Sequence, residues 1–469
     1  MKRIAAVFLF FVFITACGES VSVYASGNQA SDLLEKVKLG REMLQAIPLN
    51  YVRGVTGYRR VKVRRRTYRQ APIYGVVSQE IAMVVLRDDT GELEIVRGLK
   101  TGDSFAVTTP GYQVTMNEEN GVNTEFDTEQ GRVVAVKQLL FNAFDKPGVT
   151  AAIYTPYCHR FVEPAVIQEG FQRLKDLDAR ARVKLNVFSR AFPSLPVTEV
   201  IDPELIQILI IIEHITPSEM QLKGVDYVVN KVLVTLALNG DDSYGYSRSS
   251  ANAFGLAQFI RSSYNMIRAN YASAGLIPDF IEGMRNVENA IMAMILLNDL
   301  NLASLNSLYG DSLTPEAKKR LLAAAYNGGL KAARALARRE GLVGKVPTVI
   351  NHTANSVGYG DAPSYATLAD YNDVSRYIQQ VSWSGRQSSA RSGRKVKATR
   401  RSARTARLKG KKSSPTVARR ERTRYKSRRA VYALPAETSV YVDKYELVRR
   451  YLASLETQNA SMKIPQSGY

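Results

Sequence analysis

Hydrophobic and polar residues follow two different spacings along the chain, and the change of spacing divides it. From about residue 52 to residue 155 the chain has short β-rich runs separated by Gly, Asn and Asp, including a hairpin signal at Asp89-Thr90-Gly91. From Asp202 to about residue 382, apolar residues recur at helical spacing. We therefore predict an α+β multidomain fold in which a β-rich domain precedes an all-α domain.

Helices are also predicted outside these two regions. Residues 32–47 and 437–455 each carry an apolar stripe, and residues 168–188 look helical and charged. The full division that we predict is residues 1–16 as a signal peptide, 17–51 as a tether and helix, 52–160 as the β-rich domain, 161–199 as a helical connector, 200–383 as the all-α domain, 384–430 as a basic disordered segment, and 431–469 as a C-terminal helix and tail.

The N-terminus has the pattern of a targeting signal. Two basic residues precede a run of 13 residues from Ile4 to Ala16 that is apolar except for Thr15. Because a helix needs about 20 residues to span a bilayer, this run has the length of a signal peptide. Its end, Ile14-Thr15-Ala16-Cys17-Gly18, resembles the lipobox of bacterial lipoproteins. That resemblance implies a lipid on Cys17 and a periplasmic protein anchored to the outer membrane. The alternative is an ordinary cleavage site with an incidental cysteine.

The net charge of +21 is concentrated near the C-terminus. Between Arg386 and Arg429 there are 19 Lys and Arg against one acid, so the rest of the chain is nearly balanced at +3. A segment this charged, without an apolar period, is expected to be disordered and to bind polyanions. Composition alone suggests nucleic acid. Behind a lipobox, however, we expect anionic envelope polymers as partners and no nucleic acid. A solvated linker is the alternative.

Cysteine and histidine give no sign of a metal site. Cys158 and His159 are adjacent, and the sequence offers no second half of a ligand set. Two such residues are far from the four ligands of a structural zinc site. We therefore expect Cys158 to be a small buried residue, with neither a metal nor a cofactor in the protein.

Glu213 is the first candidate for catalysis. It follows the apolar run from Ile208 to Ile212, where a carboxylate loses hydration. Loss of hydration raises the pKa of an acid, as a general acid needs near neutral pH. The alternative is a helix-end glutamate that reaches solvent. Other nearby acids have structural interpretations: Glu219 belongs to a helix cap, and Asp241 and Asp242 are turn residues.

Two motifs farther along the chain have side chains that suit a sugar. Gly255 and Leu256 precede Gln258, and the pair Tyr326-Asn327 ends a helix before two glycines. Gln and Asn amides both donate and accept hydrogen bonds, which suits hydroxyls and N-acetyl groups. Tyr can stack on a sugar face. Taken alone, each motif is more typical of an ordinary helix end or packing contact.

Taken together, these residues resemble the soluble-type lytic transglycosylases, which have a lysozyme-like fold. The pattern of that family is a catalytic Glu usually followed by Ser, then GLMQ, then AYN-x-G. The matches here, in the same order, are Glu213-His214, Gly255-Leu256-Ala257-Gln258 and Ala325-Tyr326-Asn327-Gly328-Gly329. Tyr377 is a candidate for the late Tyr-containing helix of the family. The resemblance covers about residues 200 to 383 and is carried by three short motifs.

This resemblance implies cleavage of the MurNAc–GlcNAc β-1,4 bond of peptidoglycan without water. Glu213 would protonate the leaving oxygen and then act as base for the MurNAc 6-hydroxyl, which closes a 1,6-anhydro ring. The resemblance also implies that the glycan strand is bound by Gly255, Leu256, Gln258, Tyr326 and Asn327. No cofactor or metal is implied.

The chain also departs from the family pattern. His214 stands in place of the usual Ser, and the interval between Glu213 and Gln258 is long. The stretch GLAQFIRSSY also resembles the membrane-bound B-type transglycosylases. A catalytically inactive or hydrolytic wall-binding lipoprotein therefore stays open, as does a cytoplasmic polyanion-binding protein. For the β-rich domain we expect a docking or spacer role, with an envelope protein as its possible partner.

Overall fold

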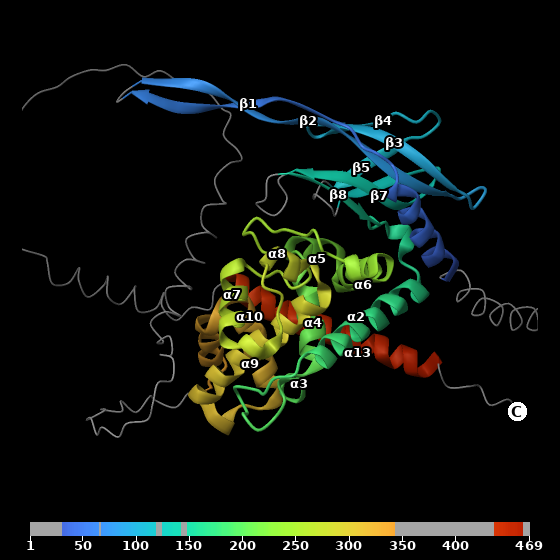
Figure 1. The fold of residues 1–469 in the computed structure, drawn as a ribbon. Coiled ribbons are helices and arrows are strands. Elements are labelled where there is room, and N and C mark those ends of the chain that lie inside the picture. The colour runs from blue at the N-terminus through green and yellow to red at the C-terminus, as the bar shows by residue number, and fades with distance from the viewer. Residues whose placement is uncertain (1–30, 65–66, 119–123, 142–147, 343–435, 463–469) are drawn as a thin grey trace, which may run out of the picture. The chain divides into compact units, whose positions relative to one another are not determined.

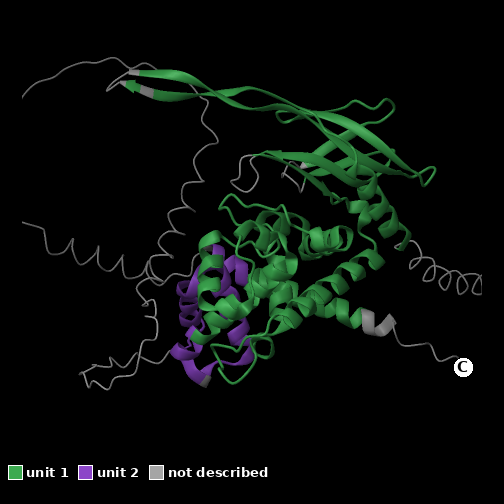
Figure 2. Cartoon of the chain, viewed as in Figure 1, with its two compact units in different colours: residues 1–303, 443–469 green, residues 304–442 purple. Residues whose placement is uncertain are grey.

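The computed structural model describes residues 31–64, 67–118, 124–141, 148–342 and 436–462 (Figure 1). The chain forms two compact units, residues 1–303 with 443–469 and residues 304–442 (Figure 2). The predicted signal peptide with Cys17, the basic segment 386–429 and Tyr377 lie outside the described residues.

The first unit begins with an antiparallel sheet region and continues as a helical region, which confirms the predicted α+β class. The main sheet has the strand order β4-β3-β2-β7-β8, and β1 pairs with β2. A smaller sheet pairs β5 with β6. The strands are β1 (Tyr51–Arg64), β2 (Thr67–Arg87), β3 (Leu93–Thr101), β4 (Ser104–Val107), β5 (Val114–Glu118), β6 (Glu125–Thr128), β7 (Gly131–Phe141) and β8 (Val149–Tyr154).

The predicted hairpin is confirmed between β2 and β3. Leu86 pairs with Leu93, and the Gly91 amide donates to the Arg87 carbonyl across the turn. Gly91 has φ +69°, a backbone conformation that glycine adopts without the Cβ penalty. The centre of β2 is buried on both faces, because the predicted helix, found at residues 31–45, packs on one face while β5 and β6 contribute to a core on the other.

The helical region follows β8. Its helices are α2 (Pro164–Lys184), α3 (Val197–Val200), α4 (Pro203–Glu213), α5 (Pro217–Lys223), α6 (Val225–Asn239), α7 (Arg261–Asn270), α8 (Phe280–Arg285) and α9 (Val287–Tyr309). Helices α2 and α6 approach so closely that a Cβ on Gly170 would lie 2.0 Å from the Leu233 carbonyl oxygen. Glycine at this position therefore sets the helix spacing on which α6 is placed.

Helix α4 is the buried axis of this region. Seven of its residues are buried, all of them Leu or Ile. Asp202 caps its N-terminus by accepting a hydrogen bond of 2.8 Å from the Glu204 amide, and Pro203 occupies the first turn. A helix that is apolar on every side requires neighbours on every side. The first charged residue after the apolar run, Glu213, is also the last residue of α4.

Helix α9 is long and apolar enough to cross a membrane, but most of its apolar stretch is buried within the protein, as in a core helix. It also buries the carboxylate of Asp299, which accepts hydrogen bonds from the Tyr271 hydroxyl at 2.7 Å and the Arg190 amide at 2.6 Å. A buried carboxylate needs such donors to replace its lost hydration.

The second unit contains the end of α9, helix α10 (Pro315–Arg339) and the start of α13 (Ala436–Met462). Helix α10 is kinked at Gly329, whose φ of 67° and ψ of −178° interrupt the helical backbone. The predicted turn after Tyr326-Asn327 is therefore present as a kink, and the helix resumes beyond it.

Candidate functional site

A pocket of about 570 Å³ lies in the first unit, at the C-terminal end of α4. Its wall includes residues of α5 and α6, the loop 242–250, Gln258, and the segment 154–157, which begins with the last residue of β8. Glu213 lines it together with Gln258, so two of the three motifs singled out in the sequence meet at one cavity.

Glu213 is the last residue of α4. The five residues before it are fully buried, whereas Glu213 itself is partly exposed. Its side chain therefore lies between an apolar core and an open pocket, and a ligand in the pocket can reach it. Both features that a general acid requires, a constrained position and access to the substrate, are present.

Lys444 binds the backbone on either side of Glu213. This buried lysine of α13 donates hydrogen bonds of 3.0 Å to the Ile212 carbonyl and 2.9 Å to the Ile215 carbonyl. Burial lowers the pKa of Lys444, and the charge of Glu213 opposes that shift. A cation at a helix C-terminus also interacts favourably with the helix dipole. Since the attraction between the two charges is mutual, Lys444 favours the carboxylate form of Glu213.

His214 joins the end of α4 to the GLAQ loop. Its Nε2 lies 2.9 Å from the Leu256 carbonyl oxygen, and its ring stacks on Tyr244 with centroids 3.6 Å apart. Burial lowers the pKa of His214 to about 4, so the ring is neutral at pH 7. The carbonyl can only accept, and Nε2 must therefore carry the proton. The replacement for the usual Ser thus forms a link between two of the matched motifs.

The loop from Tyr244 to Gln258 is held in an unusual backbone conformation. Three non-glycine residues have positive φ among those that the structure describes, and all three are here: Tyr244 at 59°, Asn252 at 62° and Gln258 at 48°. Each such residue costs roughly 1–2 kcal/mol, and strained residues of this kind cluster at binding and catalytic sites.

Within this loop, the predicted binding residues have different surroundings. Gly255 has φ +71°, and a Cβ there would lie 2.2 Å from the Met284 carbonyl oxygen. The Leu256 side chain is fully buried, and the Leu256 carbonyl oxygen accepts the hydrogen bond from His214. Gln258 lines the pocket, and its Nε2 donates to the Gly255 carbonyl at 2.7 Å. Of the three, only Gln258 presents its side chain to the pocket.

Tyr326 and Asn327 belong to the second unit, and the structure describes them within that unit alone. Tyr326 is partly buried and Asn327 is exposed. The Thr438 hydroxyl donates to Oδ1 of Asn327 at 3.2 Å. Their predicted role in binding the same ligand as Glu213 stays a prediction.

Sequence reasoning missed an ion cluster on the pocket wall. Lys231 of α6 pairs with Glu125 of β6 at 2.6 Å and with Glu219 of α5 at 3.1 Å, and its Nζ lies 5.3 Å from the centre of the Tyr157 ring. Burial opposes the charged form of Lys231, but the two carboxylates outweigh it and raise its pKa. Lys231 and Glu219 line the pocket, so Glu125 of the sheet region pairs with a residue of the pocket wall. No local pattern links Glu125 to a helix so far along the chain.

The acids near Glu213 have the following places. Thr216 caps α5 by accepting from the Glu219 amide at 3.2 Å, as predicted, but the Glu219 carboxylate turns to Lys231. Asp241 and Asp242 lie in a short 3-10 turn after Gly240 and pair with Arg180 and Arg41. Asp242 and Glu219 line the same pocket as Glu213.

Cys158 is buried, as predicted, and burial raises the pKa of its thiol, which makes it unreactive. Within residues 31–64, 67–118, 124–141, 148–342 and 436–462, no group of three or more His, Cys, Asp or Glu is arranged to hold a metal ion. Comparison of the chain with known protein families, curated proteins and solved structures finds no match.

Proposed function

We propose that the protein is a peptidoglycan lytic transglycosylase with a lysozyme-like helical region, in which Glu213 is the only carboxylate that the chemistry needs. The observation that carries the proposal is the position of Glu213 at the end of the apolar helix α4, in the wall of a pocket of about 570 Å³ that it shares with Gln258. The order of the sequence motifs supports the same assignment.

The proposed reaction breaks one bond and makes one. The Glu213 carboxyl donates its proton to the glycosidic oxygen, and the bond between this oxygen and C1 of MurNAc breaks. The resulting carboxylate takes the proton of the MurNAc 6-hydroxyl as O6 bonds to C1. The products are a 1,6-anhydro-MurNAc end and a GlcNAc end with a free 4-hydroxyl. Glu213 ends the cycle protonated again, so no water is consumed.

The surroundings of Glu213 fit a carbohydrate ligand. The polar residues Tyr246, Ser247 and Ser249 line the pocket together with Gln258. A few convergent polar groups in a partly apolar cleft are what a sugar needs for orientation. The charge of Lys444 favours the carboxylate form of Glu213, which the base step needs, and the apolar core beside it favours the neutral form, which the acid step needs.

We further propose that the enzyme acts in the periplasm, anchored to the outer membrane by a lipid on Cys17. In this proposal the segment 386–429 binds anionic envelope polymers, and the sheet region docks an envelope protein. The support for the anchor and the segment is the sequence pattern described above. Metabolic acyl labelling of the wild-type chain and of its Cys17→Ser variant tests the anchor. If Cys17 carries the lipid, only the wild-type chain takes up the label.

The alternative is a catalytically inactive or hydrolytic wall-binding lipoprotein, and one observation favours its hydrolytic form. Glu219 and Asp242 line the pocket together with Glu213, and a hydrolase uses a second carboxylate to direct water. Digestion of purified sacculi separates the possibilities by mass spectrometry. Anhydro-muropeptides support the transglycosylase, reducing ends support the hydrolase, and binding without release of products supports the inactive protein.

A further inference from the structure

The hairpin formed by β1 and β2 extends beyond the rest of the sheet (Figure 1). Residues of β2 before Ser78 pair with β1 and not with β3, and the pairing of β2 with β7 begins only at Ala82. We call residues 53–76 the β-arm. Among the residues that the structure describes, positions 53–64 and 67–76 form a two-stranded ribbon with which no third strand pairs. Two-stranded ribbons of this kind are marginally stable alone in water.

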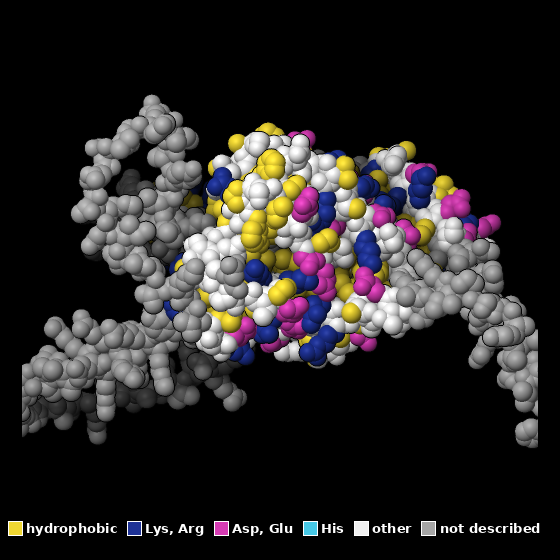
Figure 3. Space-filling view, turned by 90° about the horizontal axis from the view of Figure 1, so that it is seen from below, with side chains coloured by type: hydrophobic (Ala, Val, Ile, Leu, Met, Phe, Trp, Pro, Cys, Tyr) yellow, Lys and Arg dark blue, Asp and Glu magenta, His cyan; other side chains and the backbone are white. Residues whose placement is uncertain are grey.

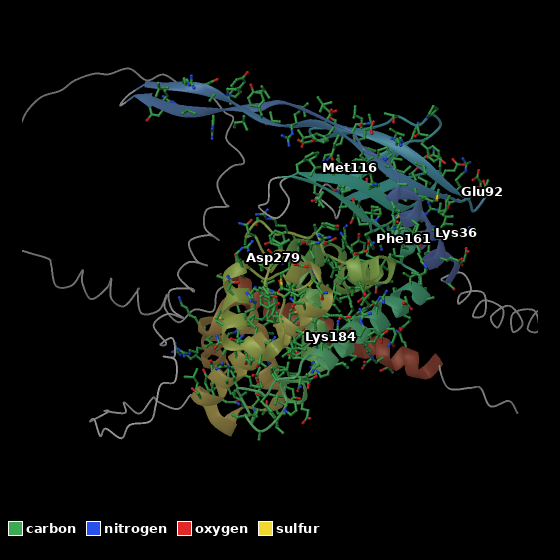
Figure 4. The ribbon with its side chains drawn as sticks, in the orientation of Figure 1. Lys36, Glu92, Met116, Phe161, Lys184 and Asp279 are labelled. Carbon is green, nitrogen blue, oxygen red and sulfur yellow. The ribbon has the colours of Figure 1, made fainter. Side chains whose placement is uncertain are left out.

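Large apolar and aromatic side chains are exposed along the β-arm. Tyr74 is 72% exposed and Tyr58 is 65% exposed. Three aliphatic residues are exposed as well: Val55, Val63 and Ile73. Side chains of the β-arm project from both faces of the ribbon (Figure 4). Such a concentration of exposed apolar side chains is typical of an interaction surface.

The charge of the β-arm has a single sign. Between residues 53 and 76 the sequence has eight Lys and Arg and no Asp or Glu. By contrast, the face seen in Figure 3 shows basic and acidic side chains interspersed. A basic β-arm repels a second copy of itself, which argues against dimerisation through this ribbon and favours an anionic partner.

Basic and aromatic side chains lie close together on the β-arm, an arrangement that suits a lipid surface. The Arg60 guanidinium lies 4.4 Å from the centre of the Tyr68 ring. Tyr58 and Arg60 lie on one face of β1, and Arg59 lies on the other. Arginine reaches lipid phosphates, tyrosine occupies the boundary between headgroups and acyl chains, and exposed Val and Ile gain by burial there.

We propose that the β-arm binds the surface of an anionic lipid bilayer, with its arginines on headgroup phosphates and its tyrosines and aliphatic side chains at the acyl boundary. Nucleic acid would also satisfy the arginines and stack on the tyrosines. It would leave Val55, Val63 and Ile73 in water, however, and these residues favour the lipid surface. The β-arm would hold the first unit at the membrane independently of a lipid on Cys17.

The test uses the full chain carrying Cys17→Ser, so that no acyl chain contributes to binding. Trp383 is the only tryptophan, so the pair Trp383→Phe and Tyr58→Trp places a single fluorescent reporter on the β-arm. Vesicles of phosphatidylcholine with phosphatidylglycerol should shift the emission of this reporter to the blue, and vesicles of phosphatidylcholine alone should not. The binding should weaken as salt is added.

Two sets of variants identify the residues responsible. Replacing Arg59, Arg60 and Arg69 with Gln should weaken binding to phosphatidylglycerol vesicles roughly a hundredfold, from about fivefold for each charge at the surface. The matched control replaces three exposed basic residues elsewhere, Lys38, Lys331 and Arg450, with Gln and should bind as the parent does. Because every variant contains the segment 386–429, any contribution of this segment to vesicle binding is the same in all of them.

The pair Val55→Ser and Ile73→Ser should also weaken vesicle binding. An unshifted reporter emission with phosphatidylglycerol vesicles would overturn the proposal. Equal loss of binding in the arm variant and the control would do the same, as would binding to duplex DNA at least as tight as to the vesicles.

Discussion

His214 and Glu213 are neighbours in sequence, yet their contacts in the structure differ. The sequence marked Glu213 by the apolar run before it, which is a local signal. His214 was visible only as a departure from the family pattern. Its partner Leu256 is 42 residues away, and no local pattern predicts a hydrogen bond across that distance. The structure shows His214 fixing the loop of Gln258 against the end of α4.

The ionisation of His214 should make stability depend on pH. Its pKa falls from 6.5 to about 4 on folding, so the unfolded chain binds the proton first. The stabilisation is complete above about pH 6.5 and is lost as the pH falls towards 4, at a cost of about 3 kcal/mol. Urea unfolding of the wild type and of His214→Gln across this range measures the difference. A parallel fall in both proteins would show that His214 is not responsible.

Gly255 should tolerate no side chain. Its φ of +71° matches the +70° of Gly275, but a Cβ meets the Met284 carbonyl at Gly255 and nothing within 4 Å at Gly275. Gly275→Ala should cost about 1 kcal/mol, for the backbone conformation alone. Gly255→Ala should cost about 3 kcal/mol or more, because a loop must also move. Chemical denaturation measures both, and equal costs would contradict the close packing.

At the scale of elements, helix and strand positions were predictable where local signals are strong. Asp202 and Pro203 mark the start of α4, and the helix predicted over residues 32–47 is found at residues 31–45. The kink in α10 was predicted only as a turn, because Gly329 indicates a break but not whether the helix resumes. The cap of α4 by Lys444 was not predictable, since a buried lysine has no sequence signature.

Removing the charge of Lys444 should affect both stability and activity. Lys444→Met leaves two buried carbonyls without this donor, which should cost about 2 kcal/mol. It also removes a cation that favours the Glu213 carboxylate, so the pH optimum of peptidoglycan cleavage should move upwards. The control is Arg450→Met, an exposed residue on the same helix. An unchanged pH profile in Lys444→Met, with activity retained, would show that the lysine is structural only.

At the scale of the molecule, the order of a sheet region before a helical region was predictable from spacing alone. Contacts between these regions were not. Thr155 and Asn239 exchange two buried hydrogen bonds, of 2.8 and 3.0 Å, and so fix the segment 154–157 beside α6. The same segment lines the pocket. The sheet region thus contributes to the candidate site, which the sequence did not indicate. The predicted domain limits stay predictions.

The charge of the chain also looks different at this scale. The segment 386–429 carries most of the net positive charge, and the remaining residues sum to only +3. The β-arm shows that the rest is itself uneven, with eight basic residues and no acid over residues 53–76. A near-zero sum had hidden this second basic segment, because acids elsewhere in the chain offset it.

The most direct test of the account compares the wild type with Glu213→Gln on purified sacculi, with mass spectrometry of the released products and sedimentation as a measure of binding. The glutamine keeps the size and polarity of the side chain but cannot donate and accept the proton. We predict that the wild type releases anhydro-muropeptides, and that Glu213→Gln binds sacculi equally well and releases none. Release of anhydro-muropeptides by Glu213→Gln at the wild-type rate would contradict the assignment of Glu213 as the catalytic acid and base.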